Sequence, residues 1–197
     1  MPTQHTKQAS GIVLLFDVVG HSEQIKYLGD TICDEALNIF LARIKDISSR
    51  YEFTWVKDIR DACLFIGNDP TKATQFYQDA LKQFPATGKT THRGFVIKFR
   101  LVAHFCSYKA TYNPENQIVE IESGKIDSLF KKMEKESKAG QMVVSIDFHK
   151  PYHQDLESEG FGERRGCPDY SPLWNASQVF HKGQTDTDRF WDIEKAW

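Results

Sequence analysis

The chain has 197 residues, 40% of them hydrophobic, and a formal net charge of -2 at pH 7. This is enough apolar material for one globular core. The charge excludes the strongly basic surface with which proteins bind nucleic acid or anionic membranes, so we expect neither as a partner.

The amino-terminal part contains no candidate signal or membrane segment. The aliphatic run Ile12 to Phe16 is far shorter than the roughly 20 residues that cross a bilayer, and residues 1–9 lack the apolar centre of a signal peptide. The cysteines are scattered without a CxxC pair, which favours reduced thiols. We therefore expect a cytoplasmic protein.

The first half of the chain predicts a strand, two helices and a hairpin. Residues 11–18 are apolar on both faces, as in a strand that is covered on both sides. A short helix is expected after the turn at Gly20. Residues 31–48 place apolar side chains every three or four positions, which predicts an amphipathic helix. The β-rich runs 51–57 and 61–67 then predict a hairpin.

The second half continues the alternation of helices and strands. The expected elements are, in order, a helix that begins at Pro70, a loop over 85–94, a strand over 95–105, a strand-and-turn segment over 106–117, a strand over 118–122, a helix over 123–138 and a strand over 140–146. This order predicts an α+β fold with helices on one face of a mostly antiparallel sheet.

The composition changes from about Phe148, where prolines, glycines and polar residues alternate with aromatic residues. We interpret this segment as an arm that packs on the domain or on a second subunit. The predicted organisation is a leader over 1–9, one domain over 10–147 and a carboxyl-terminal extension over 148–197.

Two acids stand where an apolar strand ends and where the hairpin turns. Asp17 ends the first strand, and Asp61 follows the turn of the hairpin. Neighbouring antiparallel strands can bring both carboxylates to one edge of a sheet, where hard oxygen ligands bind Mg²⁺ or Mn²⁺ together with phosphate oxygens. Spacing alone fits two solvated acids at least as well.

Four segments carry recognisable motifs in order. They are LLFDVVGHS, VKDIRDACLFIG, FRLVAHF and residues 123–145, SGKIDSLFKKMEKESKAGQMVVS. Together they resemble the metal strand, the hairpin, the R-I-G-I-H-x-G strand and the final helix and strand of the class III adenylate and guanylate cyclase catalytic domain. The similarity covers roughly residues 10–147 and implies a ferredoxin-like cyclase domain.

The resemblance implies a set of metal and phosphate ligands. Asp17 and Asp61 would be the metal-binding carboxylates, with the Val18 carbonyl as a further ligand, for two Mg²⁺ or Mn²⁺ ions per site. The substrate would be a nucleoside triphosphate, and the products a 3′,5′-cyclic nucleotide and pyrophosphate. The turn after the strand would offer backbone N–H groups to phosphate, from Val19, Gly20 and His21.

Two family positions that contact the transition state are altered. The family has Asn and Arg where this chain has Ser128 and Lys132. The resemblance implies that they act across a head-to-tail homodimer with two shared sites. Lys132 can neutralise phosphate charge but lacks the bidentate fork of Arg, and Ser128 is a shorter donor. A solvated helix face, and a degenerate pseudo-cyclase that only binds nucleotide, are the alternatives.

The base-recognition positions are also altered. Lys57 matches the purine-contacting Lys of the family, but Ile121 replaces its acidic or polar partner, with a glutamate on either side. Phe53 and Trp55 alternate with Lys57, so strand period predicts all three on one face, where the aromatics would leave space for a single-ring base. Alternatively, the aromatics belong to the core or to an interface.

Two further features qualify the resemblance. Arg60 stands where the family has Gly, at a turn position that costs a side-chain-bearing residue on the order of 1 kcal/mol. The short domain with its altered base positions looks like the pyrimidine cyclases of bacterial Pycsar anti-phage systems, which make cyclic UMP or cyclic CMP for a separate effector. We favour UTP over CTP and keep a purine cyclase as an alternative.

Overall fold

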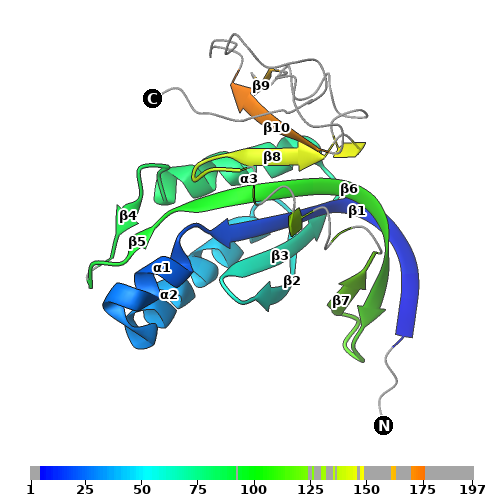
Figure 1. The fold of residues 1–197 in the computed structure, drawn as a ribbon. Coiled ribbons are helices and arrows are strands. Elements are labelled where there is room, and N and C mark those ends of the chain that lie inside the picture. The colour runs from blue at the N-terminus through cyan, green and yellow to red at the C-terminus, as the bar shows by residue number, and fades with distance from the viewer. Residues whose placement is uncertain are drawn as a thin grey trace.

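The computed structural model describes residues 5–91, 93–123, 126, 130, 131, 135, 137–145, 147, 148, 161, 162 and 170–175. Within these ranges the main sheet has eight strands, in the order β2-β3-β1-β6-β8-β10-β9, with β7 paired to β6 (Figure 1). The strands are β1 (His5–Val18), β2 (Thr54–Ile59), β3 (Ala62–Gly67), β6 (Phe99–Tyr112), β7 (Ile118–Glu122), β8 (Met142–Ser145), β9 (Phe161–Gly162) and β10 (Tyr170–Asn175).

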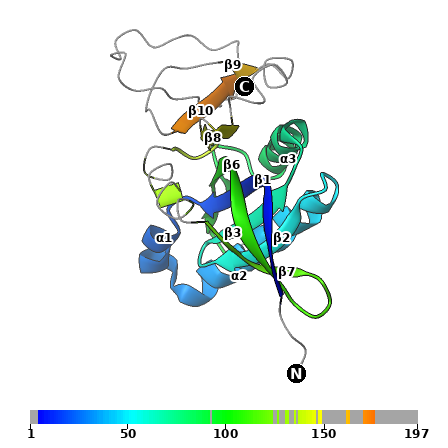
Figure 2. The ribbon, with the colours of Figure 1, turned by 90° about the vertical axis from the view of Figure 1, so that its right-hand side faces the viewer.

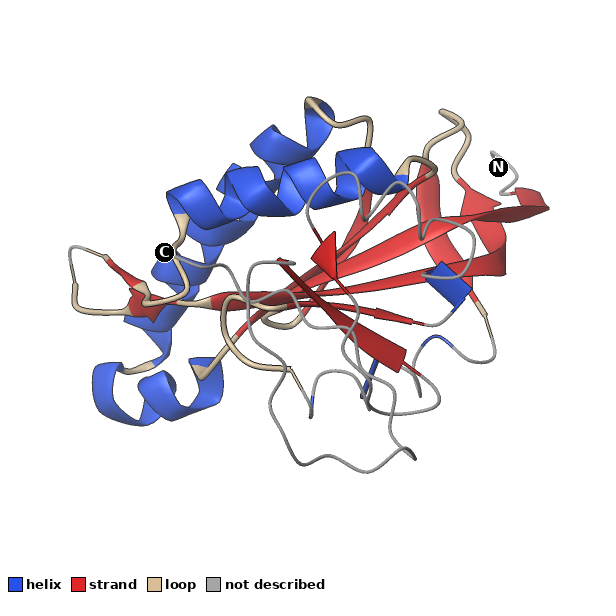
Figure 3. Cartoon of the chain, turned by 90° about the horizontal axis from the view of Figure 1, so that it is seen from above, coloured by secondary structure: helices blue, strands red, loops and turns tan. Residues whose placement is uncertain are grey.

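The pairing within the sheet is antiparallel except between β6 and β8. Helix α1 (His21–Leu28) follows β1 and leads into α2 (Asp30–Ser49), and α3 (Pro70–Gln83) follows β3. Figure 3 shows α2 and α3 along one face of the sheet. The predicted α+β class and the mostly antiparallel sheet are therefore confirmed, and both long helices lie on one face of the sheet.

The sequence explains both long helices. Every buried position of α2 belongs to the stripe predicted over 31–48 or lies beside it. Helix α3 begins at Pro70, which is favoured at the first helical position, and the Asp69 carboxylate caps it by accepting a hydrogen bond from Lys72 N at 3.1 Å.

Alternation along β1 divides the sheet into two buried faces. Ile12, Leu14 and Phe16 pack against the helices, whereas Val13 and Leu15 pack on the opposite face. That second face also buries side chains from β7 and the segment after it, among them Ile121, Ile126 and Phe130. Because side chains alternate along β1, those of its odd-numbered residues therefore point away from the long helices.

The two longest strands extend further than predicted. Strand β1 begins at His5 rather than Gly11, because His5–Val18 pairs residue by residue with Phe99–Tyr112 of β6. Strand β6 is continuous from Phe99 to Tyr112, and a turn follows over 113–117, so the strand-and-turn segment predicted over 106–117 is confirmed. The expected loop over 85–94 contains β4 (Lys89–Thr90), which forms a hairpin with β5 (Val96–Ile97).

The helix predicted over 123–138 lies mostly outside the described residues. Among those described, Ile126 and Phe130 are buried, and Lys131 and Lys135 are exposed. Of the predicted arm over 148–197, the structure describes β9, β10 and Phe148. Strand β10 pairs with β8 and continues the sheet beyond it (Figure 2).

Among the described residues, Cys33, Cys63 and Cys106 are free thiols, and Cys167 lies outside the described ranges. Burial raises the pKa of Cys106 to about 11. None of the helices in the described part of the chain has the length and hydropathy that crossing a bilayer requires.

Candidate active site

Asp17 lies one residue before the end of β1, and its neighbours across the sheet are Ala62 of β3 and Arg100 of β6. Its odd position puts its side chain on the face opposite the long helices. It is 7% exposed. A carboxylate held on a central strand at this depth has a fixed position, as a ligand for a cation needs.

Asp61 reaches the same edge from a different segment. It is the second residue of the two-residue turn between β2 and β3, and its carbonyl accepts a hydrogen bond from Val18 N at 3.1 Å. The Asp61 carboxylate also acts electrostatically on Asp17. The structure thus brings together the two acids that the sequence singled out.

Arg60 occupies the first position of this turn with φ of 55°. Glycine is preferred there, because a side chain in this left-handed region costs roughly 1–2 kcal/mol. The turn therefore keeps the positive φ that a glycine would adopt without strain.

Replacing Arg60 with glycine is expected to raise the free energy of unfolding by about 0.5–1 kcal/mol. The relieved strain of roughly 1–2 kcal/mol exceeds the added chain entropy of about 0.4–1 kcal/mol. Urea denaturation measures the change. Arg60→Ala, which removes the same side chain and keeps the strain, is the matched control, and equal stability of the two variants would contradict the prediction.

Arg100 is a site residue that the sequence analysis did not assign. Its Nε and Nη2 atoms both donate to Oδ2 of Asp17 at 2.6 Å, and Nη1 donates to the Ser137 carbonyl at 3.2 Å. Its only signal in the sequence was its place in the motif segment FRLVAHF, and the antiparallel register of the structure sets it directly across from Asp17. This edge of the sheet therefore holds the positively charged guanidinium of Arg100 beside the carboxylates of Asp17 and Asp61.

Burial raises the pKa of the Asp17 carboxyl above its ordinary value. The Arg100 guanidinium acts in the opposite direction, and the Asp61 carboxylate adds a smaller increase. A divalent cation binds the ionised carboxylate, so protons compete with the cation at this site.

The raised pKa predicts how stability depends on pH. Between the ordinary aspartate pKa and the raised one, the folded chain binds more protons than the unfolded chain, so stability falls as the pH rises. Without metal, we expect the free energy of unfolding of the wild type, relative to that of Asp17→Asn, to increase as the pH is lowered through the raised pKa towards the ordinary one. Urea denaturation of both proteins across this range checks it, and a difference that shrinks towards acid would refute it.

The turn after β1 departs in part from the predicted phosphate loop. Gly20 has φ of 79° and precedes α1. The prediction for Val19 is wrong in this conformation, because its N–H already donates to the Lys98 carbonyl at 2.8 Å. The expectations for Gly20 and His21 remain untested.

His21 is almost buried beside the second acid. Its Nδ1 lies 3.8 Å from Oδ2 of Asp61, and its ring packs edge-on against Phe95 with centroids 6.0 Å apart. Its Nε2 is buried and has no hydrogen-bond partner among the described residues. The His21 ring therefore lies beside the Asp61 carboxylate, at a separation longer than a hydrogen bond.

The donor set fits a hard divalent cation. Within the described ranges no cluster of three His, Cys, Asp or Glu side chains forms a metal site by itself. The two acids supply oxygen ligands, which Mg²⁺ prefers, and Mg²⁺ is commonly held by one or two carboxylates together with substrate phosphates. Asp17 and Asp61 are therefore sufficient only when a phosphate completes the coordination.

The Lys57 side chain lies on the same face of the sheet as that of Asp17. Its register partner is Leu64, which is buried on the face opposite the long helices. From strand spacing and rise, the Lys57 and Asp17 Cα atoms lie roughly 12 Å apart. The Lys57 Nζ lies 3.5 Å from Oε1 of Glu120 on β7, so a carboxylate accompanies this lysine even though Ile121 replaces the expected partner.

The predicted common face of Phe53, Trp55 and Lys57 is wrong. A β-bulge between Trp55 and Lys57 shifts the register, so Trp55 pairs with Phe65 on the helix side. There the Lys45 Nζ lies 4.1 Å from the centre of the Trp55 ring. Phe53 is buried on the helix side too, so neither aromatic narrows the space beside Lys57.

Ile121 is 8% exposed and packs in the core on the Lys57 side of the sheet. Ser128 and Lys132, the expected transition-state contacts, lie outside the described residues. Their roles remain predictions.

No protein-family model and no curated protein sequence matches the chain. Solved structures, in contrast, match the fold of the chain. The monomeric guanylyl cyclase domain of the RhoGC fusion protein from the aquatic fungus Blastocladiella emersonii superimposes with a TM-score of 0.67 at 19% identity, over 85% of this chain and 96% of that one. The chain has the fold of a class III nucleotide cyclase domain.

Two further cyclase structures agree. The guanylate cyclase domain of RhGC from Catenaria anguillulae, in complex with GTP, gives a TM-score of 0.65 at 17% identity, over 86% of this chain and 97% of that one. The adenylyl cyclase CyaB from P. aeruginosa gives 0.62 at 16%, over 98% and 97%. At these identities the likeness is one of fold, so what this cyclase-fold domain does must come from its own side chains.

Proposed function

We propose that the protein is a nucleotide cyclase, which converts a nucleoside triphosphate into a 3′,5′-cyclic nucleotide and pyrophosphate. The observation that carries the proposal is the convergence of Asp17 and Asp61, from β1 and from the β2–β3 turn, at one edge of the sheet. The burial of Asp17 argues against a pair of acids that are both merely solvated.

In the proposed site, different residues would bind different parts of the substrate. Asp17 and Asp61 would hold Mg²⁺ or Mn²⁺, which when bound supplies electrostatic stabilisation of the reacting oxygens. Arg100, which pairs with Asp17 in this structure, would add positive charge for the triphosphate at the same edge. Lys57, on the same face, would contact the base.

We propose that a second copy of the chain completes the site. Ser128 and Lys132 of that copy would contact the transferring phosphoryl group, as the resemblance implies. Lys132 would supply charge and Ser128 a hydroxyl donor. This proposal predicts a homodimer with two sites.

The substrate base has two candidates. A pyrimidine, with UTP ahead of CTP, is supported by Ile121, which offers no polar group to a purine edge. A purine is supported by the pair of Lys57 and Glu120, since a cation and a carboxylate 3.5 Å apart can meet a base edge with both a donor and an acceptor. The steric argument for a single ring no longer applies, because Phe53 and Trp55 lie on the other face.

If the product is cyclic UMP or cyclic CMP, we propose that it acts on a separate cyclic-nucleotide-binding effector in anti-phage defence. This part rests on the resemblance to pyrimidine cyclases. Identification of the product decides whether it stands.

The test incubates the full-length protein with ATP, GTP, UTP and CTP separately, in Mn²⁺ or Mg²⁺. Mass spectrometry identifies the product and an enzymatic assay measures pyrophosphate. We expect one cyclic nucleotide and equimolar pyrophosphate, with Glu120→Gln changing the ranking of the four substrates and Glu122→Gln, two residues along β7, leaving it unchanged. Thermal stabilisation by a nucleotide without turnover would identify a pseudo-cyclase instead.

A further inference from the structure

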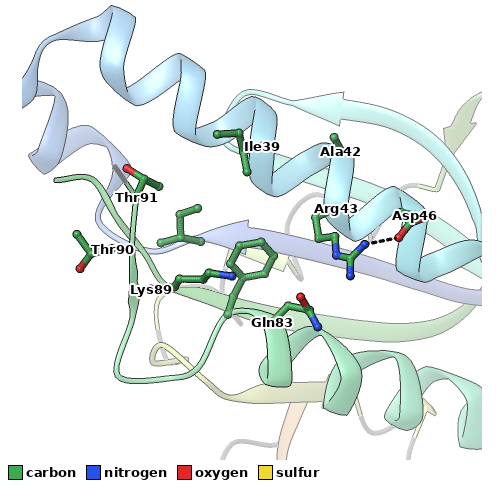
Figure 4. A pocket seen from close by; sticks show the side chains of 10 residues that line it. Ile39, Ala42, Arg43, Asp46, Gln83, Lys89, Thr90 and Thr91 are labelled. Atoms are coloured by element: carbon green, nitrogen blue, oxygen red, sulfur yellow. Dashed lines mark hydrogen bonds and ion pairs between the residues drawn. The ribbon is translucent and has the colours of Figure 1, made fainter. Parts of the chain in front are cut away.

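A cavity of about 650 Å³ lies between α2, the end of α3 and the β4–β5 hairpin (Figure 4). None of the residues proposed for cyclase chemistry lines it. Its volume falls within the roughly 300–1,000 Å³ of sites that hold small organic molecules. The cavity is therefore a second candidate ligand site on this chain.

The floor of the cavity is apolar. Phe84 at the end of α3 and Ile97 of β5 are almost fully buried, whereas Ile39 of α2, at 49% exposed, lies at the mouth. Ala42, one turn along α2, leaves the space above the floor open because of its short side chain. A ligand in this cavity would bury an apolar portion against the floor.

The hairpin wall of the cavity is held in place by hydrogen bonds. The Gln24 side chain of α1 donates to the Val96 carbonyl at 3.0 Å and accepts from Val96 N at 2.7 Å. Thr91 N donates to the Phe95 carbonyl at 2.7 Å and closes the hairpin. A wall fixed in this way does not have to be ordered by the ligand, which lowers the cost of binding.

The polar groups of the cavity carry a net positive charge. Arg43 of α2 pairs through Nη1 with Asp46 at 2.7 Å, and Lys89 of β4 lies with its Nζ 5.4 Å from the centre of the Phe84 ring. The ion pairs found in the described part of the chain do not include Lys89. The buried hydroxyl of Thr91 also lacks a hydrogen-bond partner among the described residues.

We propose that this cavity binds a small amphiphile with one anionic head group and an apolar body. The body lies on Phe84 and Ile97. The head group takes the ammonium of Lys89 and the guanidinium of Arg43, whose second terminal nitrogen projects beside the cavity in Figure 4. An oxygen of the ligand near Thr91 satisfies its hydroxyl. This site is independent of the proposed cyclase reaction.

Charge complementarity selects this occupant over a neutral or cationic one. A neutral amphiphile would leave Lys89 without a counter-charge, and a cationic one would be repelled by Lys89. Asp46 does not reverse this preference, because its carboxylate is already paired with Arg43.

Decanoate is the probe, with binding to the full-length protein measured by calorimetry and located by the methyl resonances of Ile39 and Ile97. We expect decanoate to shift both resonances and to leave that of Ile12, in the sheet, unchanged. Lys89→Gln should weaken decanoate binding about tenfold. The matched control is Lys45→Gln on α2, whose charge is engaged by Asp58 outside the cavity and whose loss should leave the affinity unchanged.

A neutral probe and a filled cavity complete the test. 1-Decanol should bind at least about tenfold more weakly than decanoate, and Ala42→Trp, checked for folding by circular dichroism, should abolish binding. Equal affinity for decanol and decanoate, or equal weakening by Lys45→Gln and Lys89→Gln, would overturn the proposal. Ile39 and Ile97 resonances that respond to protein concentration but not to decanoate would place a second copy in the cavity and would overturn it as well.

Discussion

Asp61→Asn is expected to lower kcat at least about 10³-fold, with little change in the free energy of unfolding. The substitution removes one of the two carboxylates that would hold the cation, and a bound cation supplies several kcal/mol of charge stabilisation in the transition state. Asp61 is the better position for this test than Asp17, because asparagine at position 17 would leave Arg100 without its counter-charge. Product formation under saturating nucleotide measures the effect.

Asp58→Asn is the matched control for this experiment. Asp58 lies on the same hairpin, but its carboxylate pairs with Lys45 at 2.8 Å and accepts from Trp55 Nε1 at 2.9 Å. We expect its kcat to stay within about threefold of the wild type, since surface pairs of this kind contribute little. Equal losses in the two variants would show that the hairpin, rather than a ligand for a cation, had been damaged.

Phe76→Ala is expected to lower the free energy of unfolding by about 3–5 kcal/mol. Phe76 is fully buried, and the centroid of its ring lies 4.6 Å from that of Phe16 and 5.5 Å from that of Phe65. These ring contacts join α3 to β1 and β3. Removing the ring takes away this burial and leaves a cavity between the helix and the sheet. Against a total stability of about 5–15 kcal/mol, the loss is large enough to bring the domain close to unfolding.

Tyr27→Ala provides the control for the loss of an aromatic ring. Tyr27 is 86% exposed on α1, so the same kind of truncation removes no buried surface. Its effect on the free energy of unfolding should stay within about 0.5 kcal/mol. Comparable losses in the two variants, measured by urea denaturation, would show that the ring of Phe76 does not carry the packing between α3 and the sheet.

The strong periodic signals of the sequence predicted the fold and the meeting of two acids, Asp17 and Asp61, at one edge of the sheet. The apolar stripes of α2 and α3 repeat over several turns, and the run before Asp17 is apolar on both faces, so each pattern admits few alternatives. The acids at the ends of those patterns were accordingly placed at the correct edge of the sheet.

The surroundings of Lys57 were not predictable in the same way. A strict alternation places Phe53, Trp55 and Lys57 on one face, but a single bulge reverses the direction of every side chain after it. Nothing in the local composition marks that bulge. The partner of Lys57 was missed for a related reason, because Glu120 comes close only through the pairing of β7 with a strand 14 residues long.

Arg100 illustrates how long-range register creates a site. Its sequence separation from Asp17 is 83 residues, and only the unbroken pairing of β1 with β6 sets the two side chains against each other. A prediction that ended β6 at residue 105 still contained this pair, but it did not fix the register that brings the two together.

The most direct test of the account is the position of Mn²⁺ in a crystal grown with a 3′-deoxynucleoside triphosphate, which can bind but lacks the hydroxyl needed to cyclise. Anomalous scattering locates the ion without reference to the protein coordinates. We expect a manganese peak within ligand distance of carboxylate oxygens from both Asp17 and Asp61, in contact with the triphosphate. A triphosphate-bound manganese ion that neither aspartate touches would contradict it.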